Sequence, residues 1–535
     1  MKLCIYIENF LTKPFRLYLL FLCMMVLLLS LSDIYYYIVY ENRAYTYSIY
    51  IFLQSILYAY ILSLIICFLS PSFLQTIVRL FVLIFLGLFF ILEFVSVVQH
   101  GERFNADFLY ILFGTNKSEA KEYLETFFNP QYFILTIISL LIVVLSIWGC
   151  IKYKGGVGKI GCYISLGVVL LACLSTVHNS AIYDDGICAK LQSLYSYQVP
   201  EDLRKYYKHP ILDFQRDSLP QNIILIIGES LTKHHCSLYG YNKPTNPLLS
   251  LLRDSSSLLV FNNVTSPGTS TVQSFKFFMG THKVGDNQDW YDGIVIPEVV
   301  DIAGYKSHWI SNQAGSGMHD NVIRRYAELC SDYYFNGDVF SGMNKMDYDE
   351  DLIPVVKQKI LNDTSKAFTI INLMGNHFRF NRRYPTAYDH FKATDYPDRL
   401  PSQRQILAEY DNSILYNDSV VYELMKAYEN EEAIVFYFPD HGLDVFYTSD
   451  DYAAHAKQTP ESQKIGKEIP FVIYTTDRFN KRYPLMVERM QESVNNKFCT
   501  DDLIYTVMDV MHIRFHDNDD VEKYSLFRYE DIRNR

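Results

Sequence analysis

Long apolar stretches fill the first third of this chain, and they constrain its fold more than any other feature. Each reaches the length of about 20 residues that a helix needs to cross a bilayer. The five stretches occupy residues 15–40, 48–70, 73–99, 131–151 and 160–178. One such stretch could be a buried core helix, but five in succession predict an α-helical transmembrane domain over residues 1–180.

The basic residues next to these stretches predict their orientation. Lysine and arginine cluster at residues 2–16, before the first stretch, and at 152–159, between the last two. Because basic loops tend to stay in the cytoplasm, an odd number of spans places residues 181–535 on the outer side. Residues 100–130 mix charged and apolar side chains, which predicts an interfacial helix at the outer surface. That helix could be a connector or one wall of a lipid-binding groove.

Residues 216–535 have the composition of a globular domain, and a linker at 181–215 joins them to the membrane part. Short apolar runs lie at 222–227, 257–264, 307–311, 367–373, 433–438 and 469–474. Runs of this kind predict strands that are covered on both faces, and their alternation with helices predicts an α/β domain with a central, mostly parallel sheet. The net charge of −11 offers no basic face, so no nucleic-acid partner is expected.

Polar side chains follow three of the predicted strands. Glu229 follows the first, Asn376 and His377 follow the fourth, and Asp440 and His441 follow the fifth. Any one of these groups could simply cap a loop. Because sites in such sheets form at the carboxyl ends of strands, the three together favour a metal site. Carboxylates with imidazoles suit zinc better than manganese.

A small-residue turn at 266–274 follows another predicted strand and offers Thr269, Ser270 and Thr271. A hydroxyl becomes a good nucleophile when a base or metal activates it, and a helix start would help to bind a phosphate. Serine and threonine are also favoured as helix caps, so these hydroxyls could have only that role. The pattern alone does not choose among the three hydroxyls.

Several motifs stand in a fixed order along this domain. They are GESLTKHHCSLYGYNKPTNPLL at 228–249, GTSTVQSF at 268–275, MGNH at 374–377, RRYP at 382–385, EYDNSILYND at 409–418 and DHG at 440–442. In sequence, order and spacing they resemble the lipid A phosphoethanolamine transferases, the group that includes the mobile colistin-resistance enzymes. The resemblance covers nearly the whole chain and implies a fold like that of alkaline phosphatases and sulfatases.

The resemblance also implies a zinc-dependent phosphoethanolamine transferase. Glu229, Thr271, Asp440 and His441 match the positions that hold one tight zinc ion in that family, with a second ion left open. Thr271 would take phosphoethanolamine from phosphatidylethanolamine and pass it to lipid A or another surface glycan or glycolipid. The protein is then expected to be a monomer in the bacterial inner membrane, with its catalytic domain in the periplasm.

Further site residues follow from the same resemblance. His377 and His455 would contact the phosphoryl group, support the leaving group or join a second metal site. Asn116 and Glu119, in the outer segment, would contact the substrate. Cysteines flank the nucleophile turn in that family, but here Pro267 and Phe277 replace them, so packing must hold the turn.

Three alternatives compete with this interpretation. A phosphoglycerol transferase of the lipoteichoic acid synthase kind would share the spans, the sheet and the threonine. A sulfatase would need a cysteine or serine in a C/S-x-P-x-R turn, and no cysteine here has that context. An inactive membrane-binding protein would be expected to lack some of the ligands. The cysteines of the second half, Cys188, Cys236, Cys330 and Cys499, lie far apart and imply no disulfide.

Overall fold

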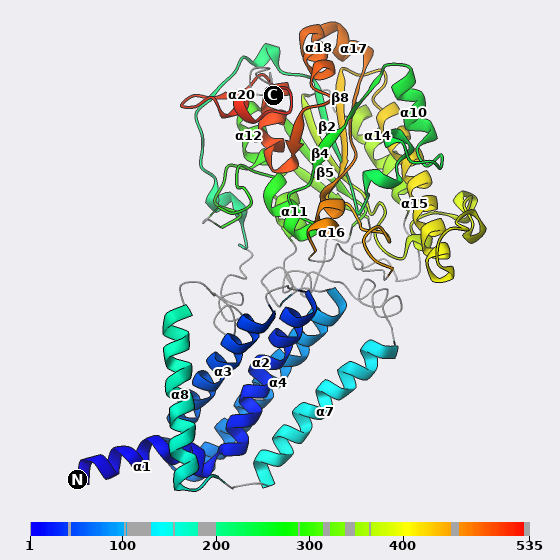
Figure 1. Cartoon of the computed structure of the whole chain (residues 1–535). Helices are drawn as coiled ribbons and strands as arrows, with labels where there is room; N and C mark the ends of the chain where they lie inside the picture. The colour runs from blue at the N-terminus through cyan, green and yellow to red at the C-terminus, as the bar shows by residue number, and fades with distance from the viewer. Residues whose placement is uncertain are drawn as a thin grey trace, which may run out of the picture. The chain divides into compact units, whose positions relative to one another are not determined.

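The computed structural model describes residues 2–40, 44–100, 103, 130–152, 156–179, 200–286, 289–313, 322–336, 348–362, 365–450 and 459–528. These residues belong to two compact units. The first is built from long helices and the second is an α/β domain (Figure 1).

The helices of the first unit are α1 (Lys2–Leu17), α2 (Leu19–Tyr40), α3 (Ala44–Ile66), α4 (Ser72–His100), α7 (Pro130–Lys152) and α8 (Lys159–Asn179). Among the described residues, four stretches are long and apolar enough to cross a membrane: Leu19–Val39, Tyr47–Ile66, Ser72–Phe94 and Lys159–Thr176. They overlap the predicted spans at 15–40, 48–70, 73–99 and 160–178.

The fifth predicted span, 131–151, coincides with α7, where the described apolar stretch is shorter, Leu140–Gly149. Five spans therefore stay a prediction. The predicted interfacial helix around 100–130 lies almost wholly outside the described residues, which include only its ends and Arg103.

Arg103 forms ion pairs with two acidic side chains that the helices of the first unit bury. Asp33 in α2 and Glu93 in α4 are fully or almost fully buried. The Nη2 atom of Arg103 lies 2.7 Å from Oδ1 of Asp33, and its Nε lies 3.9 Å from Oε1 of Glu93. Because a charge between apolar helices is costly unless it is paired, this contact makes the two carboxylates tolerable there.

The second unit is organised by its main sheet, which has seven strands within the described residues, in the order β3-β9-β8-β2-β7-β5-β6. They are β2 (Asn222–Gly228), β3 (Leu258–Phe261), β5 (Lys306–Ser311), β6 (Asp332–Phe335), β7 (Ala367–Asn372), β8 (Ala433–Pro439) and β9 (Phe471–Thr475). From β8 to β6 all neighbours are parallel, whereas β9 runs antiparallel to both β8 and β3. The predicted α/β domain with a mostly parallel sheet is confirmed.

Helices cover both faces of this sheet. They are α10 (Pro247–Asp254), α11 (Thr271–Phe278), α12 (Ile296–Ala303), α13 (Val322–Ala327), α14 (Leu352–Asn362), α15 (Pro401–Lys426), α16 (Pro460–Lys467), α17 (Asp477–Arg482), α18 (Pro484–Glu492), α19 (Leu503–Val510) and α20 (Asp520–Tyr524). Figure 1 shows α10, α14 and α15 along one side of the sheet and α12 along the other. Short strands pair outside it: β4 (Asn263–Thr265) with β10 (Lys497–Cys499), and β1 (Leu212–Asp213) with β11 (Arg514–Phe515).

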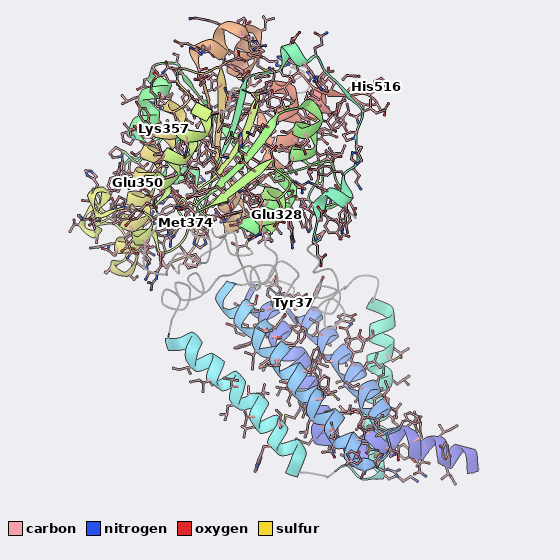
Figure 2. The ribbon with its side chains drawn as sticks, turned by 180° about the vertical axis from the view of Figure 1, so that it is seen from behind. Tyr37, Glu328, Glu350, Lys357, Met374 and His516 are labelled. Atoms are coloured by element: carbon pink, nitrogen blue, oxygen red, sulfur yellow. The ribbon has the colours of Figure 1, made fainter. Side chains whose placement is uncertain are left out.

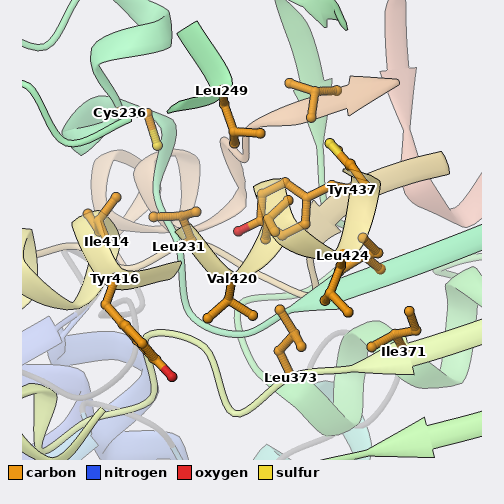
Figure 3. Close-up of a cluster of buried hydrophobic side chains, with 14 of the residues drawn as sticks. Leu231, Cys236, Leu249, Ile371, Leu373, Ile414, Tyr416, Val420, Leu424 and Tyr437 are labelled. Carbon is orange, nitrogen blue, oxygen red and sulfur yellow. The ribbon is translucent and has the colours of Figure 1, made fainter. Parts of the chain in front are cut away.

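The core lies between the long helix α15 and the sheet (Figure 3). Val420 and Leu424 of α15 pack in one cluster with Ile371 of β7 and Tyr437 of β8. Strand β2 is completely buried at residues 223–227. Each fully buried aliphatic side chain stabilises the fold by about 1.5–3 kcal/mol, so this packing fixes the point at which the chain leaves β2.

A candidate metal site with an adjacent hydroxyl

Three loops meet where the central strands end. Strand β2 lies between β7 and β8 and is parallel to both, with Gly228 opposite Pro439 and Ile227 opposite Asn372. The loops are joined by backbone hydrogen bonds from Asp440 N to Gly228 O (3.1 Å) and from Asn376 N to Glu229 O (2.9 Å). The predicted polar groups therefore emerge at one edge of the sheet, as parallel strands require.

Glu229, Asp440 and His441 form a buried cluster at this edge. Their ligand atoms all lie within 4.8 Å of one another. The Nε2 atom of His441 is 3.3 Å from Oε1 of Glu229 and 3.8 Å from Oδ2 of Asp440. On the other side of the ring, Nδ1 donates to the carbonyl oxygen of Gly442 (2.8 Å). When the imidazole is neutral, that bond keeps the proton on Nδ1 and leaves Nε2 available to a cation, as in many metal-binding histidines.

The charges of this cluster are strongly coupled. Burial together with the charge of Glu229 raises the pKa of Asp440 well above its usual range. Burial opposes protonation of His441, but the neighbouring carboxylates outweigh it and raise its pKa to about 9. Burial would likewise raise the pKa of Glu229, but the hydrogen bond and charge of His441 hold it below its ordinary value.

The cluster fits a divalent cation. A cation among these side chains would let both carboxylates stay ionised and the imidazole stay neutral. The Oδ2 atom of Asp440 is buried and has no hydrogen-bond partner, although such oxygens are normally bonded in proteins. Two carboxylates and one imidazole are a donor set that zinc accepts.

The Thr271 hydroxyl lies against this cluster. Its Oγ1 donates to the Glu229 carboxylate, 3.2 Å from Oε1 and 3.1 Å from Oε2. Thr271 is the first residue of α11, and Ser270 precedes it as an extended N-cap without a side-chain cap hydrogen bond. Thr269 Oγ1 instead accepts a weak 3.5 Å bond from Gln463. Among the three candidate hydroxyls, all of them described, Thr271 is the one that contacts the acidic cluster.

Aromatic packing holds the helix that begins with Thr271. Phe275 and Phe278 of α11 are fully buried. Phe278 meets the ring of Phe438 edge-on at 5.7 Å, and Phe275 lies 6.3 Å from the ring of Trp309. Since Phe438 belongs to β8, the same strand that leads to Asp440, this packing ties the hydroxyl to the loop that carries Asp440 and His441.

The loop after β7 needs a glycine and a buried carboxylate. Gly375 has φ +48°, and a Cβ there would lie 2.7 Å from the amide nitrogen of Glu229. Asp349 accepts from Met374 N and Gly375 N, each at 2.8 Å, and from the side chain of Asn312, also at 2.8 Å. Figure 2 shows Met374 close to Glu350, the neighbour of Asp349. Asp349 therefore fixes the approach of this loop to Glu229.

The turn after Glu229 adopts an unusual backbone conformation. Ser230 has φ +56°, which costs a residue with a side chain about 1–2 kcal/mol. Its N–H donates to Oδ1 of Asp440 (3.2 Å), and its hydroxyl donates to Oε1 of Glu229 (2.7 Å). Tyr410 of α15 donates to the Ser230 carbonyl (2.9 Å) and accepts from Thr232 N (3.1 Å). These bonds hold the strained turn in the conformation that positions the Glu229 side chain.

Of the other sequence-predicted site residues, the structure describes His377. His377 is half-buried, and its charge contributes to lowering the pKa of Glu229. His455, Asn116 and Glu119 lie outside the described residues. Of the four cysteines after residue 180, the described ones, Cys236, Cys330 and Cys499, are free thiols.

Sequence reasoning missed Gln313. It follows β5, and its Nε2 donates to Oε2 of Glu229 (3.0 Å) and to the Leu373 carbonyl (3.1 Å). The run at 307–311 was predicted as a strand of the same sheet, so the rule that singled out the groups after the other strands points to Asn312 and Gln313 as well. Asp349 had no such signal, because it precedes a helix and does not follow a strand.

The sheet, the hydroxyl at a helix start and the acidic cluster together define an α/β domain of the alkaline phosphatase and sulfatase class. A sulfatase family profile matches residues 221–513, which is more than half of the chain. The chain therefore belongs to the sulfatase family.

Curated relatives confirm the resemblance to the phosphoethanolamine transferases. The chain is 25% identical over 457 residues to phosphoethanolamine transferase EptC of Escherichia coli K12, covering 78% of this chain and 77% of that protein. It is also 25% identical over 452 residues to phosphoethanolamine transferase CptA of Salmonella typhimurium, with the same coverage of 78% and 77%.

Solved structures share the fold. The integral membrane lipooligosaccharide phosphoethanolamine transferase EptA from Neisseria meningitidis aligns with a TM-score of 0.64 at 18% identity, covering 93% of this chain and 96% of that one. The C-terminal periplasmic domain of EptC from Escherichia coli in complex with Zn aligns with a TM-score of 0.54 at 24% identity, covering 60% of this chain and 89% of that one.

Proposed function

We propose that this protein is a membrane-anchored, zinc-dependent transferase that moves phosphoethanolamine from phosphatidylethanolamine to lipid A or another surface glycan or glycolipid. The observation that carries the proposal is the Thr271 hydroxyl, which lies within 3.2 Å of both oxygens of Glu229 and beside Asp440 and His441. The curated relatives that are named phosphoethanolamine transferases support this choice of phosphotransferase.

Glu229, Thr271, Asp440 and His441 would hold the zinc ion, and a relative of the same fold has been solved in complex with Zn. When bound, zinc would lower the pKa of the Thr271 hydroxyl and offset negative charge on the phosphoryl oxygens. Zinc at these residues would also explain why two carboxylates are buried together.

Thr271 would attack the phosphorus of the donor lipid. A bond forms between Oγ1 and phosphorus, and the bond from phosphorus to the diacylglycerol oxygen breaks. The Glu229 carboxylate, which accepts the hydroxyl hydrogen bond, would orient Oγ1 and draw its proton away. His377 would donate a proton to the departing diacylglycerol oxygen. The acceptor oxygen would then form a bond to phosphorus while the bond from phosphorus to Oγ1 breaks; a proton carried by the acceptor would pass to His377, and Oγ1 would regain its proton from Glu229.

The remaining parts of the proposal concern location. Residues 1–180 would be a five-span anchor in the bacterial inner membrane, residues 181–215 the linker and 216–535 a periplasmic catalytic domain. An anchor keeps the site where both lipids lie, which raises their effective concentration. His455 would assist near the phosphoryl group, Asn116 and Glu119 would contact the substrate, and the protein would act as a monomer.

The test uses the purified, detergent-solubilised full chain with fluorescent phosphatidylethanolamine, with and without a zinc chelator, beside Thr271→Ala and Thr271→Ser. Release of diacylglycerol that is lost with chelator and in Thr271→Ala, together with a phosphoethanolamine mass shift on Thr271, is the expected result. Thr271→Ser keeps a hydroxyl and should retain part of the activity. Consumption of phosphatidylglycerol instead would establish the phosphoglycerol alternative, and no reaction with no bound zinc would establish an inactive protein.

A further inference from the structure

Gln313 touches the centre of the proposed metal site. It extends from the end of β5, and its side-chain nitrogen lies 3.0 Å from Oε2 of Glu229 and 3.1 Å from the carbonyl oxygen of Leu373. Gln313 thus links the loop after β5 to the residues that follow β7, the neighbouring strand, and β2, the next strand beyond it. None of the motifs that carry the family resemblance includes it.

The orientation of this amide is fixed by its partners. Both neighbouring atoms, a carboxylate oxygen and a carbonyl oxygen, are acceptors, so the NH₂ end and not the oxygen must face them. The two N–H groups of that nitrogen are each used, one for Glu229 and one for Leu373. Gln313 therefore acts on the carboxylate and has no N–H left for a substrate.

The two oxygens of Glu229 have different surroundings. Oε1 accepts from the hydroxyl of Ser230 at 2.7 Å and faces Nε2 of His441 at 3.3 Å. Oε2 accepts from Gln313 at 3.0 Å, and the Thr271 hydroxyl contacts both oxygens, 3.2 Å from Oε1 and 3.1 Å from Oε2. The carboxylate is consequently held at both oxygens, and it cannot rotate about its last bond without breaking one of these contacts.

We infer that Gln313 is a positioning residue, which holds the Glu229 carboxylate in the orientation that it needs beside Thr271, Asp440 and His441 to bind the metal. The inference rests on the proposed function, because it assumes the zinc site. A neutral amide suits this role, since it directs Oε2 without cancelling the negative charge that attracts the cation. A lysine or arginine in its place would compete with the metal for the same charge.

The test measures metal binding and not only turnover. Zinc affinity of the detergent-solubilised full chain is determined by competition with a chromophoric chelator, for the wild type and for Gln313→Met, which keeps the length of the side chain and removes both donors. Losing a hydrogen-bond partner of a metal ligand typically weakens metal binding about 10–100-fold, and that loss is expected here. Gln313→Glu, which sets an acidic oxygen against Oε2, should weaken it further.

A second readout is the visible absorption of the Co²⁺-substituted protein. Without Gln313 the Glu229 carboxylate would be free to turn, so its binding to the metal would change and the visible bands of Gln313→Met should shift. The matched control is Gln358→Met, the same change at an exposed position of α14. It should leave both zinc affinity and the cobalt spectrum unchanged.

The outcomes separate the inference from the function. If Gln313→Met folds and binds zinc with wild-type affinity and an unchanged cobalt spectrum, the inference is overturned while the transferase proposal stands. If the wild type itself holds no stoichiometric zinc, the proposed function falls, and the inference with it. If Gln313→Met does not fold, Gln313→Glu, which keeps the size and polarity of the side chain, decides between wild-type and weakened binding.

Discussion

Replacing Gly375 by alanine should damage the site through a contact that can be measured in the structure. The new Cβ would lie 2.7 Å from the Glu229 nitrogen and 3.1 Å from the Glu229 Cβ, whereas ordinary contact begins at 3.4 Å. The loop after β7 or the turn that carries Glu229 must therefore shift by roughly 0.7 Å, which exceeds the ~0.5 Å within which a functional site has to be held.

Two costs follow for Gly375→Ala. The positive φ of +48° costs a residue with a Cβ about 1–2 kcal/mol of folding free energy. The shift adds a loss of activity, because a misplacement near 1 Å can reduce turnover by about 100-fold. Gly304 supplies the matched control, because it has φ +80° and a Cβ added there would meet no atom within 4 Å.

The assays are thermal unfolding, zinc affinity and release of diacylglycerol from fluorescent phosphatidylethanolamine, on the full chain in detergent. Gly304→Ala should lose about 1–2 kcal/mol of stability and keep zinc binding and turnover. Gly375→Ala should lose at least as much stability, and also lose zinc affinity and between ~10- and 100-fold in turnover. Gly375→Ala with the zinc affinity and turnover of Gly304→Ala would refute the argument that this glycine is required by its approach to Glu229.

Two further substitutions test the support of the site. Phe278→Ala empties a fully buried position in the helix that begins with Thr271 and should cost about 3–5 kcal/mol in the free energy of unfolding. Leu251→Ala, at a position 61% exposed, should change it by no more than ~0.5 kcal/mol, and equal unfolding curves for the two variants would contradict this. Asp349→Ala leaves the N–H groups of Met374 and Gly375 without their acceptor, so it should lower the free energy of unfolding by about 3 kcal/mol and weaken zinc binding. Asp349→Asn keeps one acceptor oxygen and should be intermediate in both. Wild-type zinc affinity in both variants would count against the role of Asp349.

The positions of the strands, and the polar residues that follow them, could be predicted because both are visible in the local sequence. Runs such as 367–373 are apolar throughout and can only be buried on both faces, and the groups after them were expected to meet at one edge. The direction of β9 could not be predicted from its run at 469–474, since an apolar run looks the same in either direction. Likewise, α1 separates from α2 near residue 18, inside the predicted span 15–40.

The site could be predicted only in part. The residues after β2 and β8 were visible as a pattern, whereas the choice of Thr271 over Thr269 and Ser270 required the resemblance or the structure, because all three are good helix caps. The supporting residues Asp349 and Tyr410 act through hydrogen bonds to backbone far away in sequence, and nothing near them in the chain indicates those partners.

The hydrogen bond from Ser230 to Asp440 joins residues 210 positions apart. The carboxylate of Glu229 is thus synthesised long before the Asp440 and His441 with which it would share a cation, and the entropy of closing so long a loop is regained only when β8 pairs beside β2. A chain that is still being made, or that stops before residue 433, has no complete cation site. Metal content would then report whether the chain has been made past His441 and β8 has paired with β2, and the ion can bind only after that point.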